Sequence, residues 1–457
     1  MNIIPPWLAG KIIYPLHEKL MHRPTFSYLK ELNQSQYLSR EEIEALQFKK
    51  LKNLLSLAQK HCPWHAQHIL SAGIDPSANT SLTLSDLQKL PTMDKTDALN
   101  HRDQLVWMDV PGGAFKYNTG GSSGQPLIFY YGRWRQASDA AGRIRARQWF
   151  GVEVGDPEVY LWGAPVELNK TDNIKSIRDR LLNQLVLNAF EMSQENMLRY
   201  VKAISSFNPK CIYGYASSIA LLASHIQNSG KKINIPRLRV VCTTGEPLYP
   251  EQRSLIQEVF GVPVANEFGS RDIGFTAHES PNGEMLLMSE SIIMEVLDTY
   301  GQPVAPGQSG EAVLTGLCSD AQPFIRYRTG DIVKLSDKIA SDGKGLHVIE
   351  EVSGRSTDFV VKYDGTIMHA LAIIYILRAI EGLAEFKFIQ HSIDSVEVIY
   401  VANSKWDNKA HTQIESELKK RLGDKIKVIM TQVEKIPVEA SGKYRYVVSH
   451  VPLPDNV

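Results

Sequence analysis

The sequence predicts an α/β protein whose large N-terminal part carries helix-flanked, mostly parallel sheets and a β-hairpin or barrel-like part. Three observations predict this class. The 457 residues are too many for one ordinary hydrophobic core, which favours two domains. From about residue 115, short apolar segments alternate with helical stretches. From about residue 354 the pattern changes, so we expect a large domain over residues 1–353 and a small, mobile α+β lid domain over residues 354–457.

A helical lead-in is expected over residues 1–110. Its apolar residues recur with helical spacing, for example at Leu51, Leu54, Leu55 and Ala58. The first twenty residues are mildly apolar, but three prolines interrupt them and no basic segment precedes an apolar run. This argues against a signal peptide. We expect the segment to pack on its own domain, and a surface-lying membrane anchor is the alternative.

The alternating region predicts a parallel sheet flanked by helices. Apolar segments EVYLWG, PKCIYGY, LRVVCTTG and VPVANEFG end in Gly or polar turns, and the helical stretches ASSIALLASHIQNSG and PEQRSLIQEVFG lie between them. A hairpin should follow, formed by SIIMEVLD and GEAVLTGL and joined by the turn-rich YGQPVAPGQSG. The small domain should hold the helix LAIIYILRAIEG, the strands EFKFIQHS and SVEVIYVAN, the amphipathic helix NKAHTQIESELKKRLG and the strand KIKVIMTQV.

Composition excludes several classes of function. The formal net charge is zero, so nothing indicates nucleic acid or an anionic membrane as the main partner. No apolar run is long enough to form a transmembrane segment. The four cysteines form no C-x-x-C pair, which argues against a structural zinc site. Scattered thiols fit a reducing compartment, so we expect a cytoplasmic protein.

The segment YNTGGSSGQP, Tyr117 to Pro126, is a candidate phosphate-binding loop. Its three glycines allow positive φ and a close approach of the backbone, while Thr119, Ser122 and Ser123 add hydroxyl donors. Consecutive N–H groups in such a turn can bind an anion. No Lys follows the last Gly, so it is not a Walker loop. The alternative is a flexible hairpin tip between FKYN and PLIFYYG.

Two further loops follow predicted strands. TTGEPL, from Thr243 to Leu248, and VANEFGSRDIG, from Val264 to Gly274, should lie at the carboxyl end of a sheet, where ligands bind in open α/β folds. In the second loop, Phe268 could stack on a purine and Asp272 could hold Mg²⁺ through oxygen. The alternative is that both are ordinary loops between strands and helices.

Two isolated residues have the chemistry to complete a nucleotide site. In FIRYRTGDIV, Asp331 follows a Gly in a turn, where a carboxylate can accept from both ribose hydroxyls. Alternatively, Asp331 caps the turn or pairs with Arg326 or Arg328. In IPVEASGKYRYV, Lys443 follows a tight turn and could neutralise charge on a phosphate or a carboxylate, although a lone lysine in a tail is usually solvated.

The order of these motifs is more specific than any one of them. YNTGGSSGQP, TTGEPL, NEFGSRD, GEAVLTGL, YRTGD, GRSTD and SGKYR follow one another along the chain. In this order they resemble the adenylate-forming superfamily of acyl-CoA synthetases, peptide-synthetase adenylation domains and luciferases. The chain looks most like the phenylacetate–CoA ligase branch, especially its relatives in capsular polysaccharide biosynthesis. PLHEKL…SQYLSREEIEALQ and LPTMDKTDA also resemble that branch.

The resemblance implies roles for individual residues. Those of catalysis fall on Lys443, the hinge arginine Arg355 and Thr119. Those of ATP binding fall on Thr119, Gly120, Gly121, Ser122, Ser123, Gly124, Gly245, Glu246, Pro247, Asn266, Glu267, Phe268, Gly269, Ser270 and, at the ribose, Asp331. Those of the acyl pocket fall on Tyr160, Trp162, Tyr215, Ala216 and Ser217. The hinge falls on Thr357 and Asp358, and the metal-linked position on Asp272.

The chain departs from the family pattern in several places. Asp272 stands where Glu is usual, so a water could bridge it to the metal, and Arg271 stands where Ser or Thr is usual. Thr357 occupies the usual hinge position of Asp or Lys, with Asp358 next. The Gly-rich stretch that normally follows and helps to bind CoA is altered to VKYDGTIMHA, which weakens the expectation of CoA more than that of adenylation.

The resemblance implies a ligase that uses ATP and Mg²⁺ to convert an aryl or other small carboxylic acid to its acyl-adenylate, releasing pyrophosphate. The acyl group would then pass to a thiol such as CoA. One alternative acceptor is an amine or a carrier-protein thiol, in surface polysaccharide or secondary-metabolite biosynthesis. A second alternative is a non-catalytic nucleotide-binding protein. A homodimer stays open, because dimerisation leaves no motif in the sequence.

Overall fold

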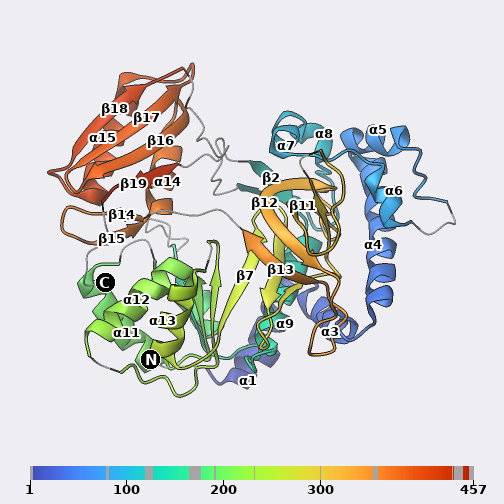
Figure 1. Ribbon diagram of the computed structural model, residues 1–457, viewed down its shortest axis with the longest axis horizontal. Helices are drawn as coiled ribbons and strands as arrows, with labels where there is room; N and C mark the ends of the chain where they lie inside the picture. Colours follow the sequence, from blue (N-terminus) through green and yellow to red (C-terminus); the bar gives the residue numbers. More distant parts are fainter. Residues whose placement is uncertain are drawn as a thin grey trace.

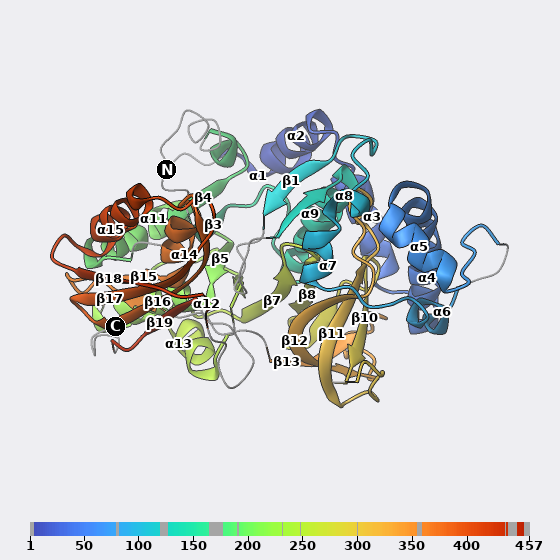
Figure 2. The ribbon, with the colours of Figure 1, turned by 90° about the horizontal axis from the view of Figure 1, so that it is seen from above.

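The computed structural model describes residues 4–78, 82–118, 127–163, 177–189, 192–230, 232–246, 248–298, 300–353, 359–434, 436 and 446–451. We call the described residues up to Ser353 the large unit and those from Phe359 onward the small unit. Helices α3, α4 and α5 lie at one end of the molecule and the small unit at the other (Figures 1 and 2). No helix in these ranges combines the length and apolar character needed to cross a membrane.

The N-terminal quarter of the chain is helical, as its apolar spacing predicts. Its longest helix begins at a capping box in which Ser39 and Glu42 satisfy each other's backbone N–H groups, and it buries Leu51, Leu54, Leu55 and Ala58. The helices are α1 (Pro6–Leu8), η1 (Ala9–Ile13), α2 (Tyr14–Leu20), α3 (Thr25–Ser35), α4 (Arg40–His61), α5 (Pro63–Ser71), α6 (Leu84–Gln88), α7 (Lys95–Asn100) and α8 (Arg102–Leu105).

The start of the described chain is held against the large unit. The backbone N–H of Ile4 donates to Oδ1 of Asn183 at 2.9 Å, and the amide of Asn183 donates back to the carbonyl of Ile4 at 2.7 Å. A Cβ at Gly10 would lie 1.9 Å from the carbonyl oxygen of Val154, so the helix is in contact there. These contacts favour packing on the chain's own domain over a surface anchor.

The large unit is built on an 11-stranded sheet in the order β10-β11-β12-β13-β9-β8-β7-β6-β5-β3-β4. Its strands are β3 (Glu158–Trp162), β4 (Gln184–Asn188), β5 (Cys211–Tyr215), β6 (Val240–Thr244), β7 (Val264–Ser270), β8 (Gly274–Glu279), β9 (Met285–Leu287), β10 (Ile292–Leu297), β11 (Ser309–Gly316), β12 (Tyr327–Ser336) and β13 (Val348–Ser353). A separate antiparallel hairpin joins β1 (Phe115–Asn118) to β2 (Ile128–Tyr131).

The half of the sheet from β4 to β7 is parallel, as the alternation of strands and helices predicts. Residues Val159 and Leu161 of β3 pack in one core with the helices that cover this face: α11 (Gln194–Phe207), α12 (Ala216–Asn228) and α13 (Pro250–Phe260). The alternate residues face α9 (Arg133–Gln148), whose Arg147 donates to the hydroxyl of Tyr160 at 3.0 Å.

The other half of the sheet is antiparallel, so the sheet as a whole is mixed rather than mostly parallel. The direction changes at β7 and β8, which are joined by a short turn. Strands β10 and β11 form the predicted hairpin, and β12 and β13 extend it. Strands joined by turns need no helical crossover, which explains why the helices stop where this half begins.

The small unit is an α+β structure that contains the predicted helices and strands, together with three short strands, β14, β15 and β19, that the sequence analysis did not predict. Its four-stranded sheet has the order β18-β17-β16-β19, and a hairpin of β14 and β15 precedes it. The elements are β14 (Phe359–Val361), β15 (Ile367–His369), α14 (Ala370–Arg378), β16 (Leu383–Ser392), β17 (Ser395–Ala402), α15 (Asn408–Leu422), β18 (Lys427–Gln432) and β19 (Val447–Ser449). The predicted domain boundary at 353/354 adjoins residues 354–358, which lie outside the described residues.

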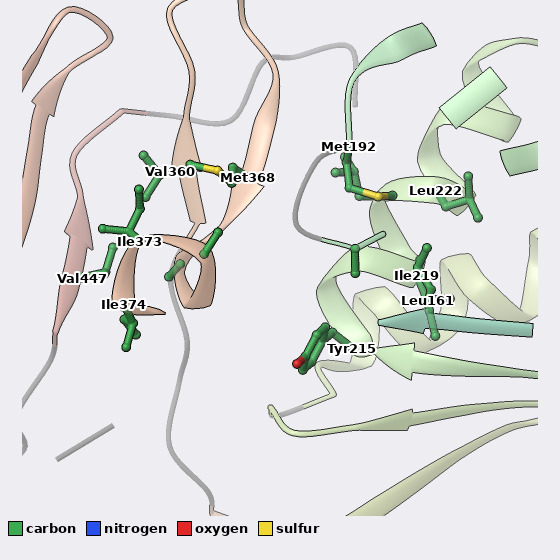
Figure 3. Packing of buried hydrophobic residues seen from close by; sticks show 14 of the residues in the cluster. Leu161, Met192, Tyr215, Ile219, Leu222, Val360, Met368, Ile373, Ile374 and Val447 are labelled. Carbon is green, nitrogen blue, oxygen red and sulfur yellow. The ribbon is translucent and has the colours of Figure 1, made fainter. Parts of the chain in front are cut away.

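The small unit lies next to the helices α12 and α13 in both ribbon views (Figures 1 and 2). Figure 3 shows apolar side chains on each side: Leu161, Ile219 and Leu222 around α12, and Val360, Met368 and Ile373 in the small unit. Tyr215 lies at the edge of the first group that faces the small unit. The carboxyl end of β5 is therefore close to α14.

Candidate active site

The candidate site lies at the carboxyl ends of the parallel strands. Trp162 ends β3, Tyr215 ends β5 and Thr244 ends β6, and these strands are neighbours in register. Because parallel strands present their carboxyl ends at the same edge, residues far apart in sequence meet there. The predicted acyl pocket and the TTGEPL loop therefore share one edge of the sheet.

An aromatic wall forms part of this edge. The rings of Trp162 and Tyr215 stack with centroids 4.4 Å apart and an interplanar angle of 13°, and Trp162 also stacks on Tyr213 at 5.7 Å. Burial raises the pKa of Tyr215 well above its usual range, and the nearby Tyr375 and Glu246 add to this. The phenol is therefore neutral. A planar apolar surface of this kind suits an aromatic or aliphatic acyl group.

Gly245, in the loop after β6, lies against the ring of Tyr215 in this wall. Its φ is +80°, and a Cβ there would lie 3.2 Å from the ring of Tyr215. Both the backbone conformation and the close approach require glycine. The loop backbone can therefore lie directly against the aromatic ring.

The next residue, Glu246, caps helix α12. Its carboxylate accepts from the backbone N–H of Ser217 at 2.7 Å and also from the Ser217 hydroxyl. A carboxylate is favoured at a helix N-terminus, where N–H groups lack partners. Ala216 and Ser217, both buried, are thus fixed beside the loop.

Asn266 and Glu267 lie on opposite faces of β7, since successive residues of a strand alternate. Asn266 accepts from the hydroxyl of Thr243 at 3.0 Å. Glu267 instead accepts from Tyr213 at 3.1 Å and Thr244 at 3.2 Å. The structure therefore places Glu267 with the aromatic wall and α9, away from the side chain of Asn266.

Gly269 and Ser270 end β7, and the turn to β8 that follows holds Arg271 and Asp272 beside the edge. Arg135 of α9 anchors this turn by donating to the carbonyl of Asp272 at 3.1 Å. Phe268, near the end of β7, packs towards the antiparallel half of the sheet. Asp272 is half-buried, and within the described ranges its side chain accepts one hydrogen bond, at Oδ1 from the backbone N–H of Ile273 at 3.2 Å.

Asp272 is the residue whose chemistry fits Mg²⁺ in this turn. Mg²⁺ bound with a nucleotide commonly needs only one or two protein carboxylates, because phosphates and water complete its shell. Among the described residues, no group of three or more His, Cys, Asp or Glu side chains could hold a metal by itself.

Asp331 lies in β12 after Gly330, whose φ is +74°. Its backbone N–H donates to the hydroxyl of Thr329 at 3.1 Å, which shapes the turn. The neighbouring arginines have other carboxylates: Arg326 pairs with Glu295 at 2.9 Å and Arg328 pairs with Glu311. The side chain of Asp331 is half-buried at this position.

Tyr160 lies deeper on the α9 face than Trp162. Its hydroxyl accepts from Arg147 at 3.0 Å and donates to Glu158 at 3.3 Å, while Arg147 and Glu158 pair at 2.8 Å. Burial and Glu158 raise the pKa of Tyr160, and Arg147 lowers it, with a net rise. Tyr160 therefore belongs to a buried polar network below the aromatic wall.

Comparison with known proteins identifies this architecture. The family model described as the CapK C-terminal domain matches residues 360–450. Protein CapK of Staphylococcus aureus is 22% identical over 448 residues, covering 97% of this chain and 96% of that protein. The phenylacetate-coenzyme A ligase of Thermus thermophilus is 24% identical over 343 residues, covering 71% and 73% respectively.

Solved structures share the fold. 2-Hydroxyisobutyryl-CoA ligase in complex with 2-HIB-AMP and CoA in the thioesterification state gives a TM-score of 0.62 at 20% identity, covering 92% of each chain. The same enzyme in the postadenylation state gives 0.60, covering 91% of each chain. The chain is therefore similar over almost its whole length to CapK and over about 70% of it to a phenylacetate-coenzyme A ligase, and it shares the fold of an acyl-CoA ligase.

Several residues with family roles lie outside the described residues. The predicted phosphate loop connects β1 to β2, which fits both a phosphate-binding loop and a hairpin tip. The roles assigned by resemblance, for these residues and for the described ones, stay predictions. The domain division and the homodimer also stay predictions. The residues outside are Thr119, Gly120, Gly121, Ser122, Ser123, Gly124, Pro247, Arg355, Thr357, Asp358 and Lys443.

Two features of the site were missed by the sequence reasoning. A terminal nitrogen of Arg271 donates to the hydroxyl of Tyr375 at 3.0 Å, which joins the β7–β8 turn to α14 of the small unit. Arg143 of α9 approaches Glu267 on the α9 face of the sheet, with Nε 3.5 Å from Oε1. The sequence around Arg271 and Arg143 did not indicate these contacts, because their partners are more than a hundred residues away along the chain.

The four cysteines are free and buried, but two of them are neighbours. Sγ of Cys211 in β5 lies 3.9 Å from Sγ of Cys242 in β6. The sequence places them 31 residues apart, and the adjacent parallel strands bring them together. They lie behind the aromatic wall, on the α9 face.

Proposed function

We propose that this protein is an ATP-dependent ligase that activates a small carboxylic acid as its acyl-adenylate and passes the acyl group to a thiol such as CoA. The observation that carries the proposal is that the Gly245–Glu246 loop, the β7–β8 turn and the aromatic wall meet at one sheet edge. This edge lies beside a small unit that matches the model of the CapK C-terminal domain.

The first step would join a carboxylate oxygen of the acid to the α-phosphorus of ATP. The bond between the α-phosphorus and its bridging oxygen breaks, and pyrophosphate leaves. Mg²⁺, which Asp272 would help to hold, would supply charge neutralisation. The protein's part is positioning: the Trp162–Tyr215 wall would hold the acyl group, and Asp331 the ribose hydroxyls. Lys443 would neutralise charge between the carboxylate and the α-phosphate.

The second step would transfer the acyl group and release AMP. A thiolate attacks the acyl carbon, and the bond from that carbon to the phosphate oxygen breaks. We propose that the small unit rotates about residues 355–358 between the steps, which withdraws Lys443 and admits the acceptor. The Arg271–Tyr375 hydrogen bond supports this, since it joins the two units in one arrangement by a contact that a rotation can break.

The first half-reaction is tested by ATP–pyrophosphate exchange with a panel of aryl and aliphatic acids. Exchange that depends on the acid is expected. Lys443→Ala should lower its rate at least a hundredfold, whereas Lys405→Ala, an exposed lysine of the same unit, should not. Unchanged exchange in a folded Lys443→Ala protein would refute the assigned role, and tight ATP binding without exchange on any acid would indicate a non-catalytic protein.

The acceptor is tested separately by supplying CoA to a protein that catalyses exchange. Formation of acyl-CoA together with AMP supports a thiol acceptor. The altered stretch VKYDGTIMHA runs from the last residue of β14 to the residue after β15. Its departure from the family pattern favours testing amines and a carrier-protein thiol as well. AMP release without acyl-CoA would exclude CoA and leave the adenylation proposal standing.

A further inference from the structure

Helix α9 presents charged residues to the sheet at four-residue intervals. Arg135, Asp139, Arg143 and Arg147 lie on the same face of the helix, because residues four apart are neighbours on its surface. This row runs from the β7–β8 turn, which Arg135 contacts, to Glu158 at the start of β3. Charges in such a position need partners.

Three members of the row have close partners. Arg135 pairs with Asp139 at 3.1 Å and donates to the Ser319 hydroxyl at 3.2 Å. Asp139 also accepts the backbone N–H of Phe275 at 3.1 Å. Arg147 pairs with Glu158 at 2.8 Å. The ion pairs and hydrogen bonds of these three side chains help to hold α9 on the sheet.

Arg143 differs from them. Its only carboxylate contact among the described residues is Nε to Oε1 of Glu267 at 3.5 Å, longer than an ordinary charge-assisted hydrogen bond. Its guanidinium lies over the ring of Phe275 with 5.2 Å to the centroid. Within the described part of the chain, neither terminal nitrogen has a hydrogen-bond partner. A guanidinium offers five donors, so most of its capacity is unused.

Solvent reaches Arg143 but not the groups around it. Its side chain is 36% exposed, whereas those of Arg135, Arg147 and Glu267 are 4%, 10% and 4% exposed. Phe275 and Tyr213 are also buried. A molecule that approaches here therefore meets the guanidinium of Arg143. The carboxylate of Glu267 is buried behind it and accepts hydrogen bonds from Tyr213 and Thr244.

Arg143 also lies beside the aromatic wall. Glu267, which it approaches, accepts from the hydroxyl of Tyr213, and Tyr213 stacks on Trp162. Trp162 in turn stacks on Tyr215. An acyl group lying along this wall would therefore extend from the nucleotide side at Tyr215 towards the free guanidinium nitrogens.

We propose that Arg143 is a specificity-determining residue that binds a second carboxylate, at the far end of the substrate acid. This rests on the proposed function, since the first carboxylate is the one activated. A planar guanidinium with two free terminal nitrogens matches a carboxylate by paired hydrogen bonds. Glu267 approaches Nε of Arg143, so it does not occupy the edge of the guanidinium that carries the two terminal nitrogens. The substrate class is then a dicarboxylic acid with one apolar or aromatic segment between its ends.

The test compares acids that differ only at the far end. Phenylacetate, 4-carboxyphenylacetate and 4-carbamoylphenylacetate form one set, and hexanoate, adipate and adipic monoamide form another. In ATP–pyrophosphate exchange, the dicarboxylate should exceed the unsubstituted acid in kcat/KM by at least tenfold in one set or both, mainly through KM. The amide should fall between them, because it retains an acceptor oxygen without the charge.

Variants of Arg143 should abolish this preference. Arg143→Met should bring the ratio of kcat/KM values close to one, and Arg143→Lys should retain part of it. Arg199→Met, at an exposed arginine of α11, is the matched control and should keep the full ratio. Because the ratio is taken within one protein, a general loss of folded enzyme cancels, and a merely structural role of Arg143 would leave the ratio unchanged.

Three results would overturn the inference. One is a wild-type protein that prefers the unsubstituted acids in both sets. Another is an Arg143→Met protein that keeps the preference. The third is an Arg143→Lys protein whose ratio is as low as that of Arg143→Met. Each of these outcomes requires exchange with some acid, so it leaves the proposed function intact. Absence of exchange with every acid would instead count against the proposed function itself.

Discussion

A buried carboxylate anchors the N-terminal helices to α9 at the scale of single residues. Glu290 accepts from Arg145 at 2.5 Å and from the hydroxyl of Ser35 at 2.8 Å, and both charged side chains are almost fully buried. Burial alone would raise the pKa of Glu290, but Arg145 outweighs it and the pKa lies below its usual range. The pair is therefore ionised and desolvated.

Glu290→Gln should destabilise the protein by about 3–5 kcal/mol at neutral pH, because it leaves the Arg145 charge buried without a counter-charge. The free energy of unfolding in urea measures this. Glu195→Gln is the matched control, since Glu195 and Arg199 form an exposed pair, which we expect to contribute less than about 1 kcal/mol. Equal losses in the two variants would contradict the argument.

Acid should remove the contribution of Glu290. A group whose folded-state pKa is lowered stabilises the fold above its unfolded-state pKa, which is 4.5 here. That contribution is lost as the pH falls through the lower folded-state value. Below pH 4.5, the wild type should therefore lose its advantage over Glu290→Gln.

His65 should make stability depend on pH in a higher window. Burial lowers its pKa from 6.5 to about 4, although its hydrogen bond to the carbonyl of Pro323 acts in the other direction. The unfolded chain therefore binds more protons than the folded chain between these values, and stability falls as the pH falls from 6.5 to 4. By pH 4.5 the loss should be about 2–3 kcal/mol.

Urea unfolding of the wild type and His65→Gln between pH 7 and pH 4.5 measures this contribution. The two curves of unfolding free energy against pH should converge as the pH falls, because Gln does not titrate. His347, whose pKa burial also lowers to about 4, remains in both proteins and cancels in the comparison. Parallel curves would show that His65 is not the source.

At the scale of elements, one side chain joins the β14–β15 hairpin to the sheet of the small unit. Gln390 of β16 donates to the carbonyl of Val361 at 2.6 Å and accepts from its N–H at 2.9 Å. It also accepts from the hydroxyl of Ser449 in β19 at 2.9 Å. Gln390 is fully buried, so no water replaces these bonds. The hairpin that follows the predicted hinge is therefore joined to β16 through the amide of Gln390.

Gln390→Leu should release the hairpin, because it leaves the N–H and the carbonyl of Val361 without partners. The cost should be about 2–5 kcal/mol. Hydrogen exchange of the β14 and β15 amides should rise while that of α12 in the large unit stays constant. Gln413→Leu, on the exposed face of α15, should change neither quantity. Unaltered exchange in β14 would show that the hairpin is held by other contacts.

The whole molecule has its small unit at one end and the helices α4, α5 and α6 at the other (Figures 1 and 2). The contact between Arg271 and Tyr375 joins the small unit to the β7–β8 turn, and Tyr215 lies beside it. If the small unit rotates between half-reactions, this hydrogen bond stabilises only the arrangement described here. Its free energy then shifts the equilibrium between this arrangement and the rotated one.

Tyr375→Phe should shift that balance by about 1 kcal/mol, or roughly fivefold, away from the described arrangement. Paired spin labels on α13 and α15 would measure the distance distribution between the units. Tyr300→Phe, at a fully exposed residue, should leave the distribution unchanged. An identical distribution in Tyr375→Phe would mean that this bond does not set the arrangement.

Local patterns in the sequence were sufficient for most elements of the fold. The helical spacing of Leu51, Leu54 and Leu55, and the alternation of strands and helices after residue 115, follow from burial of one face, which the chain shows without tertiary information. The parallel strand order near β5, β6 and β7 follows from the helices between them. The motif order was also sufficient to indicate the superfamily.

Only the tertiary structure decided how the site residues meet. The reversal of direction at β7 and β8, the face on which Glu267 lies, and the contacts of Arg143 and Arg271 depend on register and packing. These contacts join residues that are more than a hundred positions apart, so no periodicity records them. The sequence by itself determined most of the elements, because these follow from local patterns. The tertiary structure alone placed the guanidinium of Arg143, whose terminal nitrogens have no hydrogen-bond partner among the described residues, beside the aromatic wall.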